Sequence, residues 1–259
     1  MTTCAFVEWP EGLAPRGREW DEIRRQVESA RPNILVTNEL PFGAWIAGAS
    51  LFDRDVAAGS VALHEQGLEA LNALGVPTVI SSRPVWAGDR LANEAFVLAN
   101  GKPRPLHRKQ LFPEEEGWHE ETWFKGDASG FIVSDIGDLE VGVLLCTELM
   151  FNEHARHYGR AGASLIVVPR ATSISQDKWF AAGAMGAIVS GSFIVSSNRV
   201  GSSAGNPSFG GRGFAFAPDG TLVAQTSPSR TLAVIDIDPA AALRQKTLYP
   251  CNVVERRFI

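Results

Sequence analysis

Cysteine is scarce in this sequence, whose 259 residues include only Cys4, Cys146 and Cys251. Three widely spaced cysteines are too few for a disulfide framework, and they lack the close pairing that is typical of a structural zinc site. Their scarcity excludes both roles and makes thiol chemistry a hypothesis worth testing. Taken alone, however, a cysteine beside an apolar strand is more often a packed small hydrophobic residue than a nucleophile.

The sequence also lacks long apolar runs and an excess of basic residues. No segment approaches the ~18 uninterrupted apolar residues of a membrane span, and the first residues lack the basic start and apolar core of a signal peptide. We therefore expect a cytoplasmic protein without a membrane partner. The formal net charge is -5, and Lys and Arg are interspersed among acidic residues. Because no basic stripe can follow a phosphate backbone, nucleic acid is not expected as a partner.

What the sequence does contain is an ordinary globular composition, with 45% hydrophobic and 20% charged residues. Its length fits a single domain over 1–259. Apolar residues spaced three and four apart predict helices that are each followed by a buried strand. The four predicted pairs lie at 17–30 and 34–36, 68–75 and 76–81, 152–162 and 164–169, and 177–189 and 192–197.

Further strands are predicted between these pairs, several of them joined by turn sequences such as Asn100-Gly101. These strands lie at 94–99, 131–134, 141–145, 214–217 and 232–236. The pattern predicts an α/β protein with a mixed sheet. About ten strands fit one large open sheet or two packed sheets with helices outside them, and the pattern alone does not separate the two.

Three polar residues follow predicted strands or lie in a loop where chemistry is possible. Cys146 ends the run V-G-V-L-L-C, and Glu39 ends I-L-V-T-N-E. In α/β proteins, active sites form where buried strands end. Lys109 lies 70 residues after Glu39 and 37 before Cys146, in H-R-K-Q-L-F-P. Each also has an ordinary interpretation: a packed thiol, a capping or salt-bridge carboxylate, and a solvated lysine.

The ordered set resembles the nitrilase-like carbon-nitrogen hydrolase superfamily, in which a Glu, a Lys in R-K-x-x-L-F and a Cys after G-V-x-x-C occur in this order. The sequence S-S-N-R-V-G at 196–201 and P-D-G at 218–220 agree. The resemblance covers about 5–238 and leaves 239–259 as a C-terminal tail. It implies a single-domain, four-layer α-β-β-α sandwich with two mixed sheets, and a homodimer or higher homo-oligomer.

The resemblance assigns Cys146 as nucleophile, Glu39 as general base and Lys109 as the cation beside the reacting carbon. A free thiol has a pKa of about 8.5, so attack on an amide carbon needs a nearby base. Lys109 and the backbone N–H of Thr147 would stabilise the oxyanion. A thioester forms and water releases the acid, with no metal or organic cofactor.

A second acidic residue between the Lys and the Cys is part of the family pattern. It maps onto Glu120, with Glu121 as a one-residue alternative. His119 invites a Cys-His interpretation, but no Asn or Asp is placed to orient it, as such a dyad requires.

The sequence departs from the family at positions that bear on the substrate. Thr147-Glu148-Leu149 follows the cysteine where nitrilases favour Trp-Glu, so the nitrile-specific pattern is incomplete. The family's usual Arg and Glu in the helix after Trp179 are replaced by Gly186 and Val189, and a serine near the last hairpin is replaced by Gly213.

Several residues are candidates for the substrate pocket. Arg170 follows a predicted strand, where its guanidinium could hold a substrate carboxylate or pair with Glu148. Phe42, Trp45 and Trp86 lie in loops after strands and are candidate pocket walls, although aromatic residues there are more often ordinary packing.

We therefore expect a hydrolase that releases ammonia from a small amide through a cysteine thioester. Nitrile or N-carbamoyl hydrolysis by the same residues is the alternative. The substitutions at Gly186, Val189 and Gly213 raise a second alternative, a binding or assembly protein that has lost turnover. Acyl transfer to an amine would share the thioester step, but hydrolysis is the simpler outcome.

Overall fold

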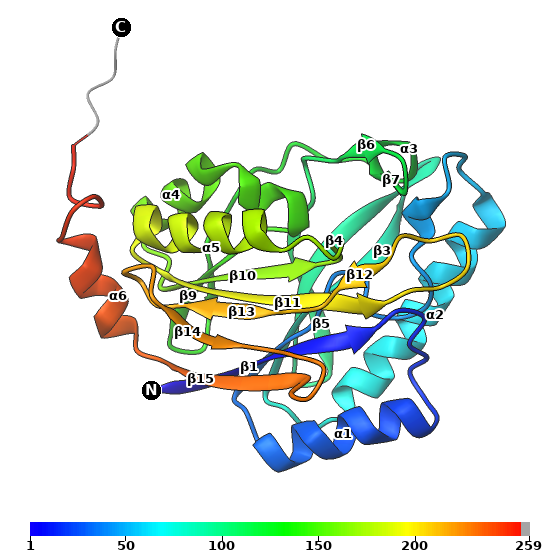
Figure 1. The fold of residues 1–259 in the computed structure, drawn as a ribbon, viewed down its shortest axis with the longest axis horizontal. Helices are drawn as coiled ribbons and strands as arrows, with labels where there is room; N and C mark the ends of the chain where they lie inside the picture. The colour runs from blue at the N-terminus through cyan, green and yellow to red at the C-terminus, as the bar shows by residue number, and fades with distance from the viewer. Residues whose placement is uncertain (255–259) are drawn as a thin grey trace, which may run out of the picture.

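The computed structural model describes residues 1–254, and its centre is the first strand, β1 (Thr2–Pro10). β1 pairs in parallel with β2 (Ile34–Val36) and antiparallel with β15 (Leu232–Ile237). At Glu8–Pro10 it pairs in parallel with β11 (Phe193–Gly201). One strand therefore belongs to both halves of the sheet (Figure 1).

The first half continues from β2 through β3 (Thr78–Ala87), β4 (Arg90–Ala99) and β5 (Lys102–Arg108). The second half runs from β11 through β10 (Leu165–Arg170) and β9 (Leu139–Val143) to β8 (Ser134–Ile136). On the other side of β11 lie the short strands β12 (Phe209–Gly210), β13 (Phe214–Phe216) and β14 (Leu222–Gln225).

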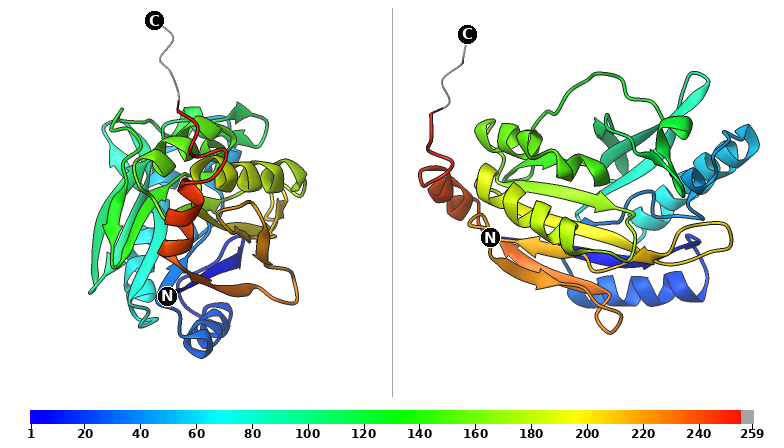
Figure 2. Two further views of the ribbon diagram at one scale, coloured as in Figure 1. Left: turned by 90° about the vertical axis from the view of Figure 1, so that its left-hand side faces the viewer. Right: turned by 45° about the horizontal axis from the view of Figure 1, so that its top comes forward.

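Helices cover the two outer faces, so the predicted four layers are present (Figures 1 and 2). α1 (Arg18–Ala30) and α2 (Arg54–Asn72) pack on the first half, and α4 (Asn152–Arg160) and α5 (Asp177–Ser190) on the second. The inner core joins the facing halves through residues such as Phe6 and Val167. The two sheets are continuous through β1 and β11 and form one 13-stranded sheet.

Shorter elements complete the chain. The 3₁₀ helices η1 (Ile46–Gly48) and η2 (Cys146–Met150) follow strand ends, and the hairpin of β6 (Glu114–Glu115) and β7 (Trp118–His119) leads into α3 (Glu120–Trp123). The predicted tail contains α6 (Pro239–Lys246), and the last five of its residues lie outside the described part. No helix within 1–254 is long and apolar enough to cross a membrane.

One predicted strand is wrong, and two long strands were not predicted, each for an identifiable reason. Phe131 does not enter a strand, because its ring stacks on His154 of α4 with centroids 3.7 Å apart, and β8 begins only at Ser134. β1 was not predicted, since it is buried on both faces and shows no alternation. β5 was not predicted because it contains Pro103 and Pro105, which an edge strand tolerates.

The small residues of α5 serve close packing inside the chain. A Cβ on Gly183 would lie 2.6 Å from the ring of Phe214 on β13. The helix therefore sits directly on the sheet at this point, which fixes where its N-terminal end meets the strand ends.

Candidate active site

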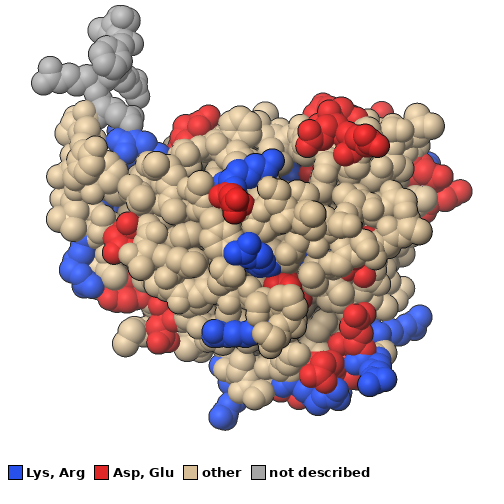
Figure 3. Space-filling model, in the orientation of Figure 1, with Lys and Arg blue, Asp and Glu red and all other residues tan. Residues whose placement is uncertain are grey.

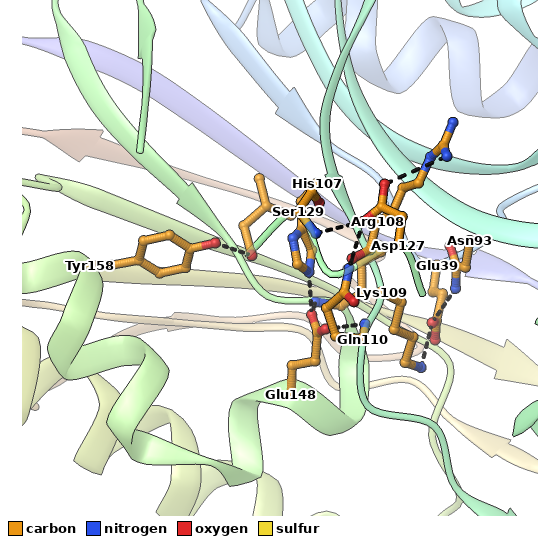
Figure 4. Close-up of polar contacts among 12 residues, drawn as sticks. Glu39, Asn93, His107, Arg108, Lys109, Gln110, Asp127, Ser129, Glu148 and Tyr158 are labelled. Atoms are coloured by element: carbon orange, nitrogen blue, oxygen red, sulfur yellow. Dashed lines mark hydrogen bonds and ion pairs between the residues drawn. The ribbon is translucent and has the colours of Figure 1, made fainter. Parts of the chain in front are cut away.

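The predicted catalytic residues meet at one edge of the sheet, where strands end. Glu39 follows β2, Lys109 follows β5, Cys146 follows β9, and Arg170 ends β10. Glu39, Lys109 and Cys146 are all buried. Figure 4 shows the side chains of Glu39 and Lys109 directed at each other.

Lys109 is held between two carboxylates. Its Nζ donates to Oε1 of Glu39 at 2.9 Å and to Oε2 of Glu120 at 2.5 Å. Asn93 on β4, which the sequence analysis did not name as a site residue, donates from Nδ2 to the same Glu39 oxygen at 2.8 Å. An ammonium has three protons, so one of them is left for a substrate. Oε2 of Glu39 and Oε1 of Glu120 accept no hydrogen bond from the described residues.

The charges of this cluster shift two pKa values in a defined way. Burial lowers the pKa of Lys109, but the carboxylates of Glu120 and Glu39 outweigh burial and raise it above its usual range. Burial raises the pKa of Glu120 to about 8, and Glu39 adds to this, although Lys109 opposes it. Lys109 is therefore a permanent cation, and Glu120 is a carboxyl group that can hold a proton near neutral pH.

Cys146 lies at the turn from β9 into η2, with a left-handed backbone conformation at φ 51°. This conformation is uncommon for a residue with a side chain and is often found at functional sites. The thiol donates to the carbonyl of Ala171 at 3.8 Å. Burial and then the Glu39 carboxylate raise the pKa of Cys146, while Lys109 lowers it. The thiol is therefore protonated at rest and needs a base.

A cavity of about 180 Å³ opens beside Cys146. Cys146, Thr147 and Glu120 all line this cavity. Trp118 of the β6–β7 hairpin and Trp179 of α5 provide aromatic surface. The lining is completed by Pro113, Glu115, Met150, Ala171, Thr172, Ser173 and Lys178.

Glu148 is a buried carboxylate that was predicted only as a possible partner of Arg170. Its Oε1 accepts from the backbone N–H of Gln110 at 2.7 Å, and its Oε2 accepts from the N–H of Leu145 at 2.7 Å. Nε2 of His107 lies 2.8 Å from the same Oε2 (Figure 4). Glu148 thus joins the segment of Lys109 to the segment of Cys146. Its position two residues after the cysteine was the available sequence signal.

Arg199 fixes the loop that carries Glu39. Its guanidinium pairs with Glu11 and donates to the carbonyls of Leu40, Glu39 and Gly43, the last at 2.9 Å. Both ions of the pair are almost completely buried, so the loop is anchored from β11. This gives a structural role to the arginine of the family motif S-S-N-R-V-G.

Glu120, and not Glu121, reaches the site. Glu120 is buried on Lys109, whereas Glu121 is exposed. His119 is likewise turned away from the cysteine, since its Nδ1 lies 2.8 Å from Oε1 of Glu114. The structure thus decides between the two glutamates, because consecutive residues at the start of a helix point in different directions.

Phe42 does not form a wall of the cavity. Its ring packs between sheet and helices, 6.2 Å from Trp9 and 5.6 Å from Trp20. Trp86 is also elsewhere, beneath the guanidinium of Arg54. Trp45 supports the cavity from behind, with its ring 5.8 Å from that of Trp118. Phe42 therefore belongs to the apolar core between the sheet and its outer helices, and it is not part of the site.

Arg170 makes neither of the two contacts considered for it. It does not line the cavity or pair with Glu148, whose oxygens are occupied by His107 and by backbone N–H groups. Its guanidinium is buried and donates to the neutral oxygens of Ser196 and Gln176 at 2.6 and 3.0 Å. Arg170 is the last residue of β10 and donates to Ser196 on the neighbouring strand β11, so the next two residues, Ala171 and Thr172, line the cavity instead.

Within 1–254, His, Cys, Asp and Glu side chains form no group of three or more that could hold a metal ion. The site is thus built from a thiol, two carboxylates and an ammonium. Fold and site together place the chain in the carbon-nitrogen hydrolase family, whose sequence model matches residues 20–246. This is a family of hydrolases, and the chain has the four-layer fold described above.

Individual relatives show how far the likeness extends. Glutamine-dependent NAD(+) synthetase of Xanthomonas campestris is 30% identical over 181 residues, which are 67% of this chain and 32% of that enzyme. N-carbamoylputrescine amidase of Arabidopsis thaliana is 29% identical over 171 residues, 58% of this chain and 56% of the relative. The aligned part therefore spans about a third to about half of these relatives.

A solved structure shows the same fold over nearly the whole chain. The carbon-nitrogen hydrolase from Helicobacter pylori G27 superposes with a TM-score of 0.86 and covers 97% of this chain and 94% of its own, at 18% identity. At 18% identity this likeness establishes the fold but not the reaction.

Proposed function

We propose that this protein hydrolyses a small primary carboxamide to ammonia and a carboxylic acid through a thioester on Cys146. The observation that carries the proposal is the pair of unpartnered buried carboxylate oxygens, Oε2 of Glu39 and Oε1 of Glu120. Buried acceptors are costly unless they receive a hydrogen bond. An amide –NH₂ offers two donors to such oxygens, whereas a nitrile offers none.

Glu39 takes the thiol proton in the first step, and the sulfur attacks the amide carbon. The protonated resting thiol, whose pKa is raised, makes a base necessary. Lys109 holds Glu39 in place, since the two form a buried ion pair at 2.9 Å. Attack is therefore coupled to proton transfer rather than preceded by a stable thiolate.

The oxyanion of the tetrahedral adduct is stabilised by the third proton of Lys109 and by the backbone N–H of Thr147. Loss of one such donor typically costs about 100-fold or more in rate. The adduct collapses when Glu39 returns the proton to the leaving nitrogen, which departs as ammonia and leaves the thioester. Water, activated by Glu39 or Glu120, then releases the acid and restores the thiol.

The experiment is a panel of matched small amides, nitriles and N-carbamoyl compounds with ammonia release as readout. We expect ammonia from primary amides and an acyl adduct on the intact protein by mass spectrometry. Cys146→Ala should give neither. Turnover confined to nitriles would contradict the proposal, and the absence of any adduct across the panel would favour a binding protein that has lost turnover.

A second candidate, N-carbamoyl amine hydrolysis, has one specific observation in its favour. The carboxylate of Glu115 lines the cavity, and exposed acidic side chains gather over the β6–β7 hairpin (Figure 3). A distal ammonium would suit this rim, and one amidase relative is named for such a substrate. Release of carbon dioxide together with ammonia would identify this reaction, because a simple amide gives ammonia alone.

A further inference from the structure

Arg170 is a fully buried cation without a carboxylate partner in the described chain. Its Nε donates to Oγ of Ser196 at 2.6 Å, and its Nη1 donates to Gln176 at 3.0 Å and Thr172 at 3.3 Å. Nη2 donates to the carbonyl of Arg212 at 3.2 Å. All of these acceptors are neutral. A buried ion normally needs an opposite charge to offset its desolvation, so its retention calls for an explanation.

Arg170 adjoins the segment that contacts the cysteine. The next residue, Ala171, accepts the hydrogen bond of the Cys146 thiol. The cation also lies over the ring of Trp179, which lines the cavity, at 5.3 Å from its centroid, and over Phe214 at 4.5 Å. Burial lowers the pKa of Arg170 to about 9, and the charge that opposes this is that of Cys146. The residue therefore stays charged at neutral pH.

The other charged groups around Cys146 explain why a further cation is useful there. Glu39 after β2, Glu120 on α3 and Lys109 after β5 face the sulfur, and the single charge of Lys109 is shared by the two carboxylates. Proton transfer to Glu39 moves negative charge from that carboxylate to the sulfur. Lys109 contacts the carboxylate that loses the charge, whereas Arg170, which has no carboxylate of its own, precedes the residue that contacts the sulfur.

We propose that Arg170 is a positioning residue whose uncompensated charge stabilises the negative charge that develops on Cys146 as its proton moves to Glu39, and the anionic adduct that follows. Its hydrogen bonds to Thr172 and Gln176 also hold the segment that forms one wall of the cavity. The inference rests on the proposed role of Cys146 as nucleophile, but it concerns the charge on the sulfur and is independent of which amide is the substrate.

The test measures the alkylation of Cys146 by iodoacetamide, in which an S–C bond forms and iodide leaves, between about pH 6 and pH 10. Peptide-resolved mass spectrometry separates Cys146 from Cys4 and Cys251. We expect Arg170→Met to react about tenfold more slowly below the thiol midpoint, which corresponds to an upward shift of about one pKa unit. Arg170→Lys, which keeps the charge, should recover most of the rate.

A second variant tests the effect of the Arg170 charge in case Arg170→Met does not fold. Gln176→Glu leaves the guanidinium in place but gives it a carboxylate partner at Nη1, and we expect the same upward shift. Arg212→Gln is the control, because this arginine is exposed and lends only its backbone carbonyl to Arg170. It should alkylate as wild type.

A folded Arg170→Met or Gln176→Glu with the wild-type pH profile would overturn the proposal. A purely structural role would lower the melting temperature or raise KM without moving that profile. The assay uses no amide turnover, so it can fail while the proposed amidase reaction holds, and it can succeed where no tested amide is hydrolysed.

Discussion

The carboxylate of Glu148 lies 2.8 Å from Nε2 of His107 and thereby connects two catalytic segments that are far apart in the sequence. Glu148 is two residues after Cys146, and His107 is two residues before Lys109. The same carboxylate also accepts from backbone N–H groups of both segments. The distance between nucleophile and ammonium is therefore set by one buried side chain.

Replacing Glu148 should affect catalysis through position alone. Glu148→Gln keeps the shape but turns a donor toward the N–H of Leu145 or Gln110, and we expect kcat/KM for the best amide to fall about tenfold or more. The free energy of unfolding, measured with urea, should fall by about 1–3 kcal/mol. The matched control is Glu121→Gln, which changes an exposed neighbour of the site and should leave both values unchanged. Wild-type kinetics in Glu148→Gln would contradict this role.

Lys109 should be essential for stability as well as for turnover. Lys109→Met leaves Glu39 and Glu120 buried without their cation, which typically costs about 3–5 kcal/mol. At about pH 9, where Glu120 of the wild type is ionised, the same change should cost less in a Glu120→Gln background, because only Glu39 then loses its cation. Urea denaturation of the four proteins of this cycle measures the coupling. Equal costs in both backgrounds would show that Glu120 does not depend on Lys109.

The raised pKa of Glu120 predicts a pH-dependent stability. Because this carboxyl group binds its proton more tightly in the folded state, its contribution is fully present below its ordinary pKa of about 4.5 and is lost as the pH rises through about 8. Glu120→Gln cannot lose that proton. The stability of wild type relative to Glu120→Gln should therefore fall between about pH 4.5 and pH 8, as followed by thermal unfolding. A difference that grows with pH over this window would have the wrong sign.

Kinetics can distinguish an aromatic residue that lines the cavity from one in the outer core. Trp118→Leu removes cavity surface and should change KM severalfold while kcat changes less. Phe42→Leu lies in the outer core and should lower stability by about 1–2 kcal/mol without a change in KM. Ammonia release and thermal unfolding on both variants provide the measurement. An altered KM in Phe42→Leu would return that residue to the pocket.

Much of the architecture follows from local sequence patterns. The helix-strand pairs were predictable because amphipathic spacing and Gly or Pro signals act within one segment, as in α1 and β2. β1 and β5 were missed because one is buried on both faces and the other contains prolines at an edge. Phe131 was misassigned because its partner, His154, lies on a separate helix.

By itself, the sequence determined the family and the order of Glu39, Lys109 and Cys146, since these depend on residue types at strand ends. Tertiary structure alone decided that Glu120 rather than Glu121 meets Lys109, and that Glu148 joins the two segments. It also placed Phe42 in the outer core and gave Arg170 only neutral hydrogen-bond partners. The physical reason is that burial, direction and charge compensation arise from residues brought together across the whole sheet, and a local pattern does not contain those partners.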